Sequence, residues 1–181
     1  MFRIFALFFF VGEIVQAAEI KITVTGQANG EIVIDLLEDV APMHVERIKT
    51  LAALGFYDNV VFHRVIDGFM AQTGDVEYGK ANGDLSYAGR GASLLPDLPA
   101  EFSEIPYDRG VVGMARSRNP NSANSQFFIM FSEGYFLNGQ YTVVGKVKSG
   151  MNIVDDIKRG KGQNGSVLAE PDVMRSVAVI Q

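Results

Sequence analysis

The sequence contains no cysteine, no tryptophan and only two histidines among its 181 residues. The absence of cysteine excludes disulfide bonds, thiol nucleophiles and lipoprotein-type acylation, and it leaves the redox compartment open. His44 and His63 are expected on a helix and on a strand, and no cysteine is present to complete a zinc site with them. We therefore expect no metal and no cofactor. His63 is expected to face inward with its ring nitrogens hydrogen-bonded.

Motifs of several enzyme classes are missing as well. No Gly-x-Ser-x-Gly nucleophile elbow occurs, and no pair of carboxylates stands out. Gly89-Arg90-Gly91 begins a Gly-x-Gly motif, but Leu94 stands where dinucleotide binding would require a third glycine. Positive charge is scarce too, since the net charge is −5 and the pI is near 5.0. The chain therefore has no electrostatic footprint for nucleic acid, and we expect no nucleic-acid partner.

The first 17 residues differ from the rest of the chain. An apolar run over 4–12 follows Arg3, and Val15-Gln16-Ala17 places small residues at a cleavage site. The run is shorter than the ~20 residues that span a bilayer. We therefore expect a signal peptide over 1–17, a mature domain over 18–181, a periplasmic location and no stable membrane insertion after cleavage. An uncleaved anchor or a buried N-terminal strand is the alternative.

At 181 residues the chain suits one domain with an adequate core, and the 48% of hydrophobic residues argue against disorder. Pro42, with Asp39 as a possible cap, starts a helix that Gly55 ends, and a second short helix is expected from Met151 to Lys158. Strands are expected over residues 21–25, 31–37, 60–66, 69–73, 110–115, 126–131, 142–147 and 173–180. The pattern is typical of a mainly β protein with two helices.

The stretch 62–75 predicts a hairpin with an unusual outer face. Asp67-Gly68 between two alternating runs favours a type I′ turn, which needs a positive φ at both central residues. Met70 and Gln72 share one face of the second strand, and Arg64 lies on the first. We expect these faces to point outward, which would place Met70 in solvent as part of a shallow peptide-binding surface. The alternative is an edge hairpin with an isolated surface methionine.

A second stretch, 110–131, runs Gly-Val-Val-Gly-Met-Ala-Arg-Ser and, after an Asn/Ser loop, Ser-Gln-Phe-Phe-Ile-Met-Phe. Taken alone, it predicts a buried strand. Together with Phe-His-Arg-Val-Ile-x-Gly-Phe-Met-x-Gln-x-Gly-Asp, it resembles the cyclophilin family of peptidyl-prolyl cis/trans isomerases. The resemblance runs from about Ile20 to the C-terminus and is densest at 62–75, 110–131 and 136–147. It implies a closed eight-stranded antiparallel β-barrel with two capping α-helices and a site on the outside.

The resemblance also implies roles for individual residues. Arg64 is the expected catalytic residue, because a fixed donor near the proline nitrogen stabilises the twisted amide more than the planar one. The proline ring would bind to Phe69, Met70, Phe128 and Leu137. Gln72 would hold a substrate carbonyl, Ala115 and Arg116 would contact the peptide backbone, and Gln126, Phe136 and Tyr141 would complete the substrate-binding set.

Three positions depart from the best-known members of the family. Phe136 stands where many have tryptophan, Tyr141 where many have histidine, and Arg116 where many have asparagine. The first two exchanges keep an aromatic ring at the site. They put sensitivity to family inhibitors in doubt. The Arg116 side chain would add charge to the binding groove.

We therefore expect a peptidyl-prolyl cis/trans isomerase that accelerates X-Pro bond rotation while exported proteins fold. Its partners would be proline-containing unfolded or partly folded polypeptides, and it would act as a monomer. The alternative is a proline-peptide-binding chaperone or assembly module with little turnover. Arg64 together with Gln72 favours the enzyme, because proline binding would need only the apolar pocket.

Overall fold

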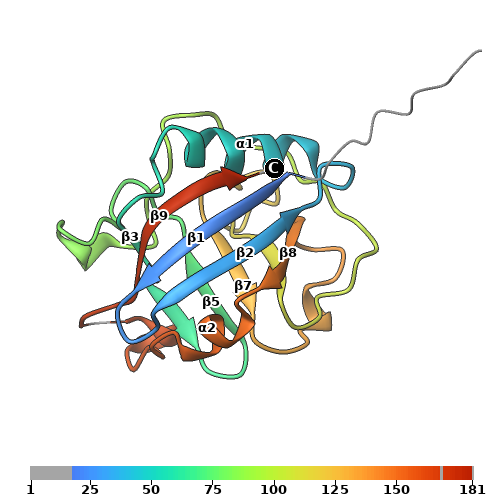
Figure 1. Ribbon diagram of the computed structural model, residues 1–181. Helices are drawn as coiled ribbons and strands as arrows, with labels where there is room; N and C mark the ends of the chain where they lie inside the picture. Colours follow the sequence, from blue (N-terminus) through green and yellow to red (C-terminus); the bar gives the residue numbers. More distant parts are fainter. Residues whose placement is uncertain (1–17, 168, 181) are drawn as a thin grey trace, which may run out of the picture.

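The protein folds around one curled β-sheet, and the computed structural model describes residues 18–167 and 169–180 (Figure 1). The strands are β1 (Glu19–Thr25), β2 (Gly30–Leu36), β3 (Val60–Val61), β4 (Arg64–Ile66), β5 (Met70–Thr73), β6 (Val111–Met114), β7 (Phe127–Met130), β8 (Val143–Ser149) and β9 (Val173–Ile180). Neighbouring strands are antiparallel, in the order β3-β9-β1-β2-β8-β6-β7-β5-β4. The predicted mainly β class is confirmed, and the expected signal peptide over 1–17 lies outside the described residues.

The sheet does not close into the eight-stranded barrel that we expected. Its two end strands, β3 and β4, come from the segment 60–66, which was predicted as one strand and is interrupted at Phe62 and His63. Phe62 N–H donates to Asp172 O (2.9 Å), and His63 O accepts from Val167 N–H (3.0 Å). The chain changes its pairing partner at these two residues, from β9 to β5, so the ends of the nine-stranded sheet are joined along the chain rather than paired side by side. The result is a curled half-barrel.

Two α-helices lie at opposite ends of the curled sheet, as Figure 1 shows. The first, α1 (Pro42–Ala53), packs against β9, and the second, α2 (Met151–Asp156), packs against β2. The two predicted helices are confirmed. Three short 3-10 turns complete the described structure, η1 (Leu85–Tyr87), η2 (Tyr135–Leu137) and η3 (Gln163–Gly165).

The N-terminus of α1 is capped from a distant segment. Glu101 accepts hydrogen bonds from the backbone N–H groups of Met43 (3.2 Å) and His44 (3.1 Å). Its carboxylate also lies 2.6 Å from Nδ1 of the His44 ring. The prediction that Asp39 caps this helix is wrong, because the orphan N–H groups of the first turn are satisfied by a carboxylate almost sixty residues away.

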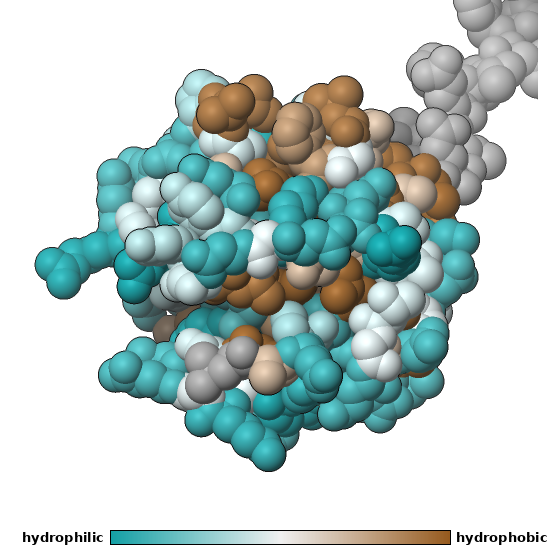
Figure 2. Space-filling view, turned by 90° about the vertical axis from the view of Figure 1, so that its left-hand side faces the viewer, coloured by the Kyte–Doolittle hydropathy of each residue, from teal (hydrophilic) through white to brown (hydrophobic). Residues whose placement is uncertain are grey.

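The face shown in Figure 2 is mostly hydrophilic, with hydrophobic groups gathered at the end of the molecule where α1 lies and in a band across the middle. Just after α1, Leu54 is 67% exposed and Phe56 is 47% exposed. In the part of the chain that the structure describes, no helix is long and apolar enough to cross a membrane.

Alternation along the strands divides the apolar side chains between two packed layers. On β7, Phe127 and Ile129 belong to the main core inside the curled sheet, whereas Phe128 and Met130 belong to a second cluster on the opposite face. We call this second cluster the outer cluster, and its buried members are Met70, Tyr107, Val111, Phe128, Met130, Leu137 and Val143. Burial on both faces explains why this strand reads as a continuous apolar run.

The β4–β5 hairpin is confirmed, but its turn differs from the prediction. Ile66 pairs with Met70, and Phe69 N–H donates to Ile66 O (3.1 Å), so the loop contains three residues. Gly68 has φ +67°, whereas Asp67 does not have a positive φ. A type I′ turn needs a positive φ at both residues, so that assignment is wrong.

Candidate active site

A hollow of about 240 Å³ opens on the outer face of the sheet, beside the outer cluster. Its walls come from the β4–β5 hairpin, from β7, from the segment after β6 and from η2 with the residues that follow it. It is lined by Arg64, Phe69, Met70, Gln72, Ala115, Arg116, Phe128, Phe136, Leu137 and Tyr141. The fold therefore gathers every residue that the sequence nominated for the site except Gln126, which lies just beyond Gln72.

Met70 lies at the floor of this hollow rather than in solvent. It is 2% exposed and pairs with Met130 across the β5–β7 ladder. Leu137, which belongs to η2, packs in the same cluster and is 7% exposed. The expectation that Met70 stands in solvent is therefore wrong, because a segment distant in sequence covers this part of the outer face. The pocket is deeper and drier than the strand pattern alone predicts.

Arg64 is held beside the hollow from two sides. Its Nη1–H donates to Gln72 Oε1 (3.1 Å), the residue directly opposite on β5, and its Nε–H donates to Asn164 O (3.0 Å) in η3. Nη2 makes no hydrogen bond within the described part of the chain. Burial lowers the pKa of the Arg64 guanidinium from its ordinary value, but arginine still carries its charge at neutral pH. The group is thus a fixed positive donor with one nitrogen available to a ligand.

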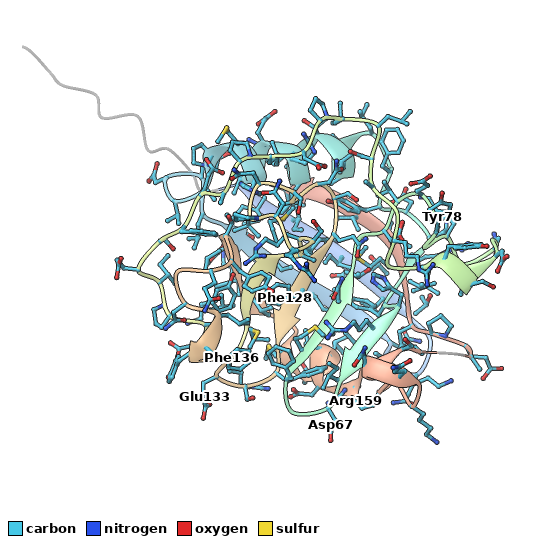
Figure 3. All side chains as sticks on the ribbon, turned by 180° about the vertical axis from the view of Figure 1, so that it is seen from behind. Asp67, Tyr78, Phe128, Glu133, Phe136 and Arg159 are labelled. Atoms are coloured by element: carbon cyan, nitrogen blue, oxygen red, sulfur yellow. The ribbon has the colours of Figure 1, made fainter. Side chains whose placement is uncertain are left out.

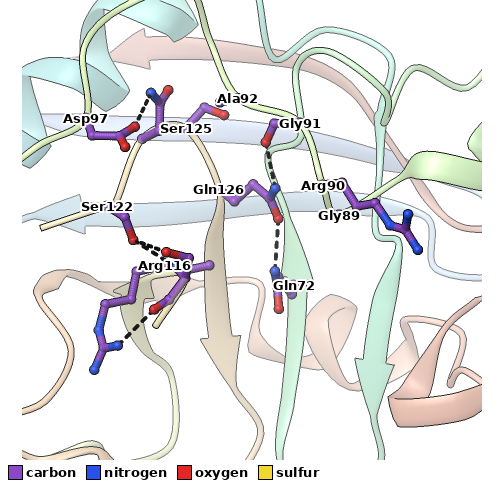
Figure 4. A pocket seen from close by; sticks show the side chains of 13 residues that line it. Gln72, Gly89, Arg90, Gly91, Ala92, Asp97, Arg116, Ser122, Ser125 and Gln126 are labelled. Carbon is purple, nitrogen blue, oxygen red and sulfur yellow. Dashed lines mark hydrogen bonds between the residues drawn. The ribbon is translucent and has the colours of Figure 1, made fainter. Parts of the chain in front are cut away.

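Two glutamine side chains extend this network along the surface. Gln72 Nε2–H donates to Gln126 Oε1 (2.9 Å), and Gln126 Nε2–H donates to Gly91 O (2.8 Å), as Figure 4 shows. Gln126 and Gly91 line a second, more polar hollow of about 360 Å³ that shares Gln72, Ala115 and Arg116 with the first. No sequence pattern indicated the roles of Gly91 and of the Asn164 carbonyl in this network, because both contacts are long-range.

A stack of aromatic rings forms the back of the apolar hollow. Phe128 is 5% exposed, and Tyr107 lies behind it with the two ring centroids 5.8 Å apart and the planes at 22°. Tyr141 meets Phe128 edge to face, at 5.9 Å and 84°. Gly113 on β6 leaves the space that the two stacked rings occupy. Tyr107 was not among the residues expected at the site, although it fixes the position of one that was.

Phe136 forms the outer rim of the hollow. It is 67% exposed, and its ring lies 5.4 Å from that of Phe69, with the planes tilted by 35°. Figure 3 shows Phe128 and Phe136 on the same side of the molecule. The ring of Phe136 offers apolar contact but no N–H donor.

Among residues 18–167 and 169–180, no three His, Asp or Glu side chains gather in a way that could hold a metal ion.

Comparison with known proteins gives one family. The model described as "Cyclophilin type peptidyl-prolyl cis-trans isomerase/CLD" matches residues 20–179. A "Probable peptidyl-prolyl cis-trans isomerase" of Brucella suis biovar 1 is 58% identical over 146 residues, which cover 80% of this chain and 74% of that protein. A "Peptidyl-prolyl cis-trans isomerase-like 1" of Emericella nidulans is 36% identical over 156 residues, covering 83% and 90%.

The chain belongs to the cyclophilin-type peptidyl-prolyl cis-trans isomerases. A solved cyclophilin of Cryptosporidium parvum agrees, with a TM-score of 0.76 and 25% identity over 92% of this chain and 99% of that one. A second structure of that protein, determined in the presence of the dipeptide Ala-Pro, has a TM-score of 0.75 and 27% identity over 90% and 99%. The enzyme class expected from the sequence is confirmed.

In this cyclophilin Arg116 stands between the two hollows. Its guanidinium carbon lies 4.3 Å from the centre of the Tyr141 ring. Its Nε–H and Nη2–H donate to Gln140 O (3.1 and 2.8 Å), and its Nη1–H donates to Ser117 O (3.0 Å). The side chain is therefore fixed across the surface by carbonyl groups and by a cation–π contact, and it brings a positive charge to the edge of the groove.

We expect Arg116 to favour peptides with Asp or Glu near the proline. A partly exposed ion pair is worth ~0.2–1 kcal/mol, so the preference should reach at most about fivefold in kcat/KM and should fade with salt. The measurement compares the parent with Arg116→Asn on acidic and neutral peptides of otherwise equal sequence. An identical ratio for the two proteins would show that this charge does not select substrates.

His63 is buried behind the site, and its ring lacks hydrogen-bond partners in the described part of the chain. It is 7% exposed, and within the described residues neither Nδ1 nor Nε2 has a partner. The expected inward orientation is confirmed, but the expectation of satisfied ring nitrogens is wrong. Burial lowers the pKa of His63 to about 4, although the negative charge of Asp75 acts in the opposite direction.

This shift makes the stability of the enzyme depend on pH. The unfolded chain binds a proton at His63 near the ordinary pKa of about 6.5, whereas the folded chain does so only near 4, so the stabilisation present above pH 6.5 is lost as the pH falls toward 4. At about 1.4 kcal/mol per pKa unit the loss is roughly 3 kcal/mol. Urea unfolding between pH 7 and 4.5 should give a flatter dependence for His63→Gln than for the parent, and equal slopes would contradict the assignment.

Proposed function

We propose that this cyclophilin accelerates X-Pro bond rotation in proline-containing, unfolded or partly folded polypeptides that have been exported, and that it works in the periplasm as a monomer. The observation that carries the proposal is the position of Arg64, a doubly tethered guanidinium at the edge of a deep apolar hollow. A cyclophilin of Cryptosporidium parvum whose structure was determined in the presence of the dipeptide Ala-Pro supports a proline ligand for such a hollow.

The position of Arg64 beside the apolar hollow would stabilise the twisted form of the X-Pro amide. Rotation about a peptide bond has a barrier of ~18–20 kcal/mol because nitrogen and carbonyl are in resonance. When the bond twists, the proline nitrogen regains a lone pair, and a donor from Arg64 stabilises that state more than the planar one. Phe69, Phe128 and Leu137 would hold the ring, and the dry walls would strengthen the field of the guanidinium. No proton has to be transferred.

Gln72 would hold the substrate carbonyl while the ring is bound. Its Oε1 accepts from Arg64, so its NH₂ group faces away from the guanidinium. One hydrogen of that NH₂ group is used on Gln126, and the second remains for a ligand carbonyl. The main chain at Ala115 would bind the peptide beside it.

Removal of residues 1–17 would leave the whole sheet, since β1 begins at Glu19. We therefore expect the protein from its native source to begin at or near Ala18. Intact-mass measurement of the protein purified from a periplasmic fraction tests both export and cleavage. A cytosolic full-length species starting at Met1 would contradict the proposal.

The activity itself is tested on a protein substrate. Residues 18–181 should shorten the slow, proline-limited refolding phase of a small exported protein, a phase that otherwise takes tens of seconds. The fast phases and the final yield should not change. A higher yield without a faster slow phase would instead support a chaperone with little turnover.

A further inference from the structure

Asp75 is a buried carboxylate that is held by main-chain groups alone. It follows β5, is fully buried, and accepts four backbone hydrogen bonds. Its Oδ1 accepts from the N–H groups of Glu77 (3.1 Å) and Tyr78 (2.9 Å), and its Oδ2 accepts from those of Gly89 (2.7 Å) and Gly91 (3.0 Å). Within the described residues no cation forms a salt bridge with it. The four N–H groups satisfy both oxygens of the carboxylate, and these hydrogen bonds offset the free-energy cost of burying it.

This carboxylate fixes the segment that ends the glutamine network. Gly91 donates its N–H to Asp75 and accepts from Gln126 Nε2–H at its carbonyl (2.8 Å). A Cβ on Gly91 would lie 2.3 Å from Asp75 Oδ1, so the close approach requires glycine at this position. The position of the Gly91 carbonyl is therefore set by Asp75.

The orientation of each glutamine amide is set by the groups at the two ends of the network, the Gly91 carbonyl and the Arg64 guanidinium. Gly91 offers Gln126 a carbonyl, which can only accept, so Gln126 must turn its NH₂ group toward Gly91 and its Oε1 toward Gln72. Arg64 can only donate, so Gln72 must turn its Oε1 toward the guanidinium. If Gly91 moved away, Gln126 would lose one of its two anchors, and only the hydrogen bond from Arg64 would keep the Gln72 amide in its orientation.

We propose that Asp75 is a positioning residue for prolyl isomerisation, and that it acts through Gly91 and Gln126 on the orientation of Gln72 and Arg64. The inference rests on the roles proposed above for Arg64 and Gln72. Asp75 lines neither hollow, so any effect on turnover must pass through other groups. Without its carboxylate the apolar pocket remains, and kcat should fall more than KM rises.

A buried carboxylate elsewhere supplies a matched control. Asp172 is 1% exposed and accepts from the backbone N–H groups of Ala28 (2.8 Å) and Lys158 (2.6 Å), at the end of the molecule near α2. Asp75→Asn and Asp172→Asn should both lower the free energy of unfolding. Only Asp75→Asn should lower kcat/KM, by about tenfold, as expected for one lost orienting hydrogen bond. Of the two variants, only Asp75→Asn should shift the NMR resonances of the side-chain NH₂ groups of Gln72 and Gln126.

The decisive measurement is a double-mutant cycle with Gln126→Ala. If Asp75 acts through Gln126, Asp75→Asn should cost about tenfold in the parent and almost nothing in Gln126→Ala. An equal loss in both backgrounds overturns the proposal, and so does an equal loss in Asp172→Asn. If Asp75→Asn does not fold, Gly89→Ala takes its place in the cycle. Gly89 has φ +93°, and a Cβ there would lie 3.0 Å from the His63 ring, so alanine displaces the same segment and leaves the carboxylate intact.

Experiment can refute the catalytic role of Arg64 and the positioning role of Asp75 separately. A parent whose activity does not depend on Arg64 would refute the proposed mechanism. A parent whose activity depends on Arg64, but in which Asp75→Asn and Gln126→Ala are additive, would refute only the positioning role of Asp75.

Discussion

Arg64→Ala should lower kcat/KM by about 10² to 10³, because one preorganised donor to the developing charge is removed. The apolar hollow formed by Phe69, Phe128 and Leu137 stays in place, so peptide affinity should weaken only modestly. The fold should also be unchanged, since β4 pairs with β5 through its backbone. Exchange NMR on a proline peptide gives the isomerisation rate, and calorimetry gives the affinity.

Two further variants test whether a positive charge at position 64 is sufficient for catalysis. Arg64→Lys keeps the charge but loses the planar group that donates to Gln72 and to the Asn164 carbonyl at once, so it should recover little activity. Arg109→Ala is the control. That arginine is about half exposed and pairs with Asp155 (2.7 Å) away from the hollow, so its loss should leave turnover unchanged. If Arg64→Ala isomerises as fast as the parent, the mechanism is wrong and a peptide-binding role takes its place.

Much of this site could be predicted from sequence because its residues come from two hairpin-like segments with regular alternation. Arg64 and Gln72 are opposite each other on β4 and β5, and that register follows from strand period and a short loop. Phe128 likewise falls on the outer face of β7 by alternation. Local rules therefore predicted the faces of Arg64, Gln72 and Phe128, whereas other members of the site, such as Leu137 and Tyr141, were expected only from the resemblance to the cyclophilin family.

The parts that sequence could not predict depend on contacts between distant segments. Burial of Met70 depends on η2, and the tether of Arg64 depends on the Asn164 carbonyl. No side-chain pattern marks a carbonyl group as a ligand of a distant arginine. The break in the strand at Phe62 and His63 is of the same kind, because the chain changes its pairing partner there, from β9 to β5. Sequence thus predicted which residues line the hollow but not the supports behind it.

One support, the pair of Gly113 and Tyr107, leads to the second large effect. A Cβ on Gly113 would lie 2.4 Å from Tyr107 Oη and 2.6 Å from Phe128 Cζ, well inside the ~3.5–4.0 Å of normal carbon contacts. In Gly113→Ala one of the two stacked rings must therefore move by about 1 Å. Tyr107 is fully buried, whereas Phe128 borders the hollow, so Phe128 is the ring that should move.

That movement narrows the hollow where the proline ring would bind. A misplacement of about 1 Å at a site can cost ~10² in rate, so Gly113→Ala should lower kcat/KM by about that factor, mainly through KM. Overpacking should also lower the free energy of unfolding by ~1–3 kcal/mol. Gly83→Ala, in an exposed loop, is the matched control and should change neither quantity appreciably.

The cause of the loss can be tested by rescue. Tyr107→Ala removes the ring behind Phe128 and opens space for the new methyl group, so the double variant Gly113→Ala/Tyr107→Ala should regain much of the lost kcat/KM although it is less stable than the parent. Activity and urea unfolding are measured on all four proteins of the cycle at one temperature. If Tyr107→Ala lowers kcat/KM by the same factor with alanine and with glycine at position 113, the two residues do not compete for space behind Phe128, and the stack does not set the width of the proline pocket.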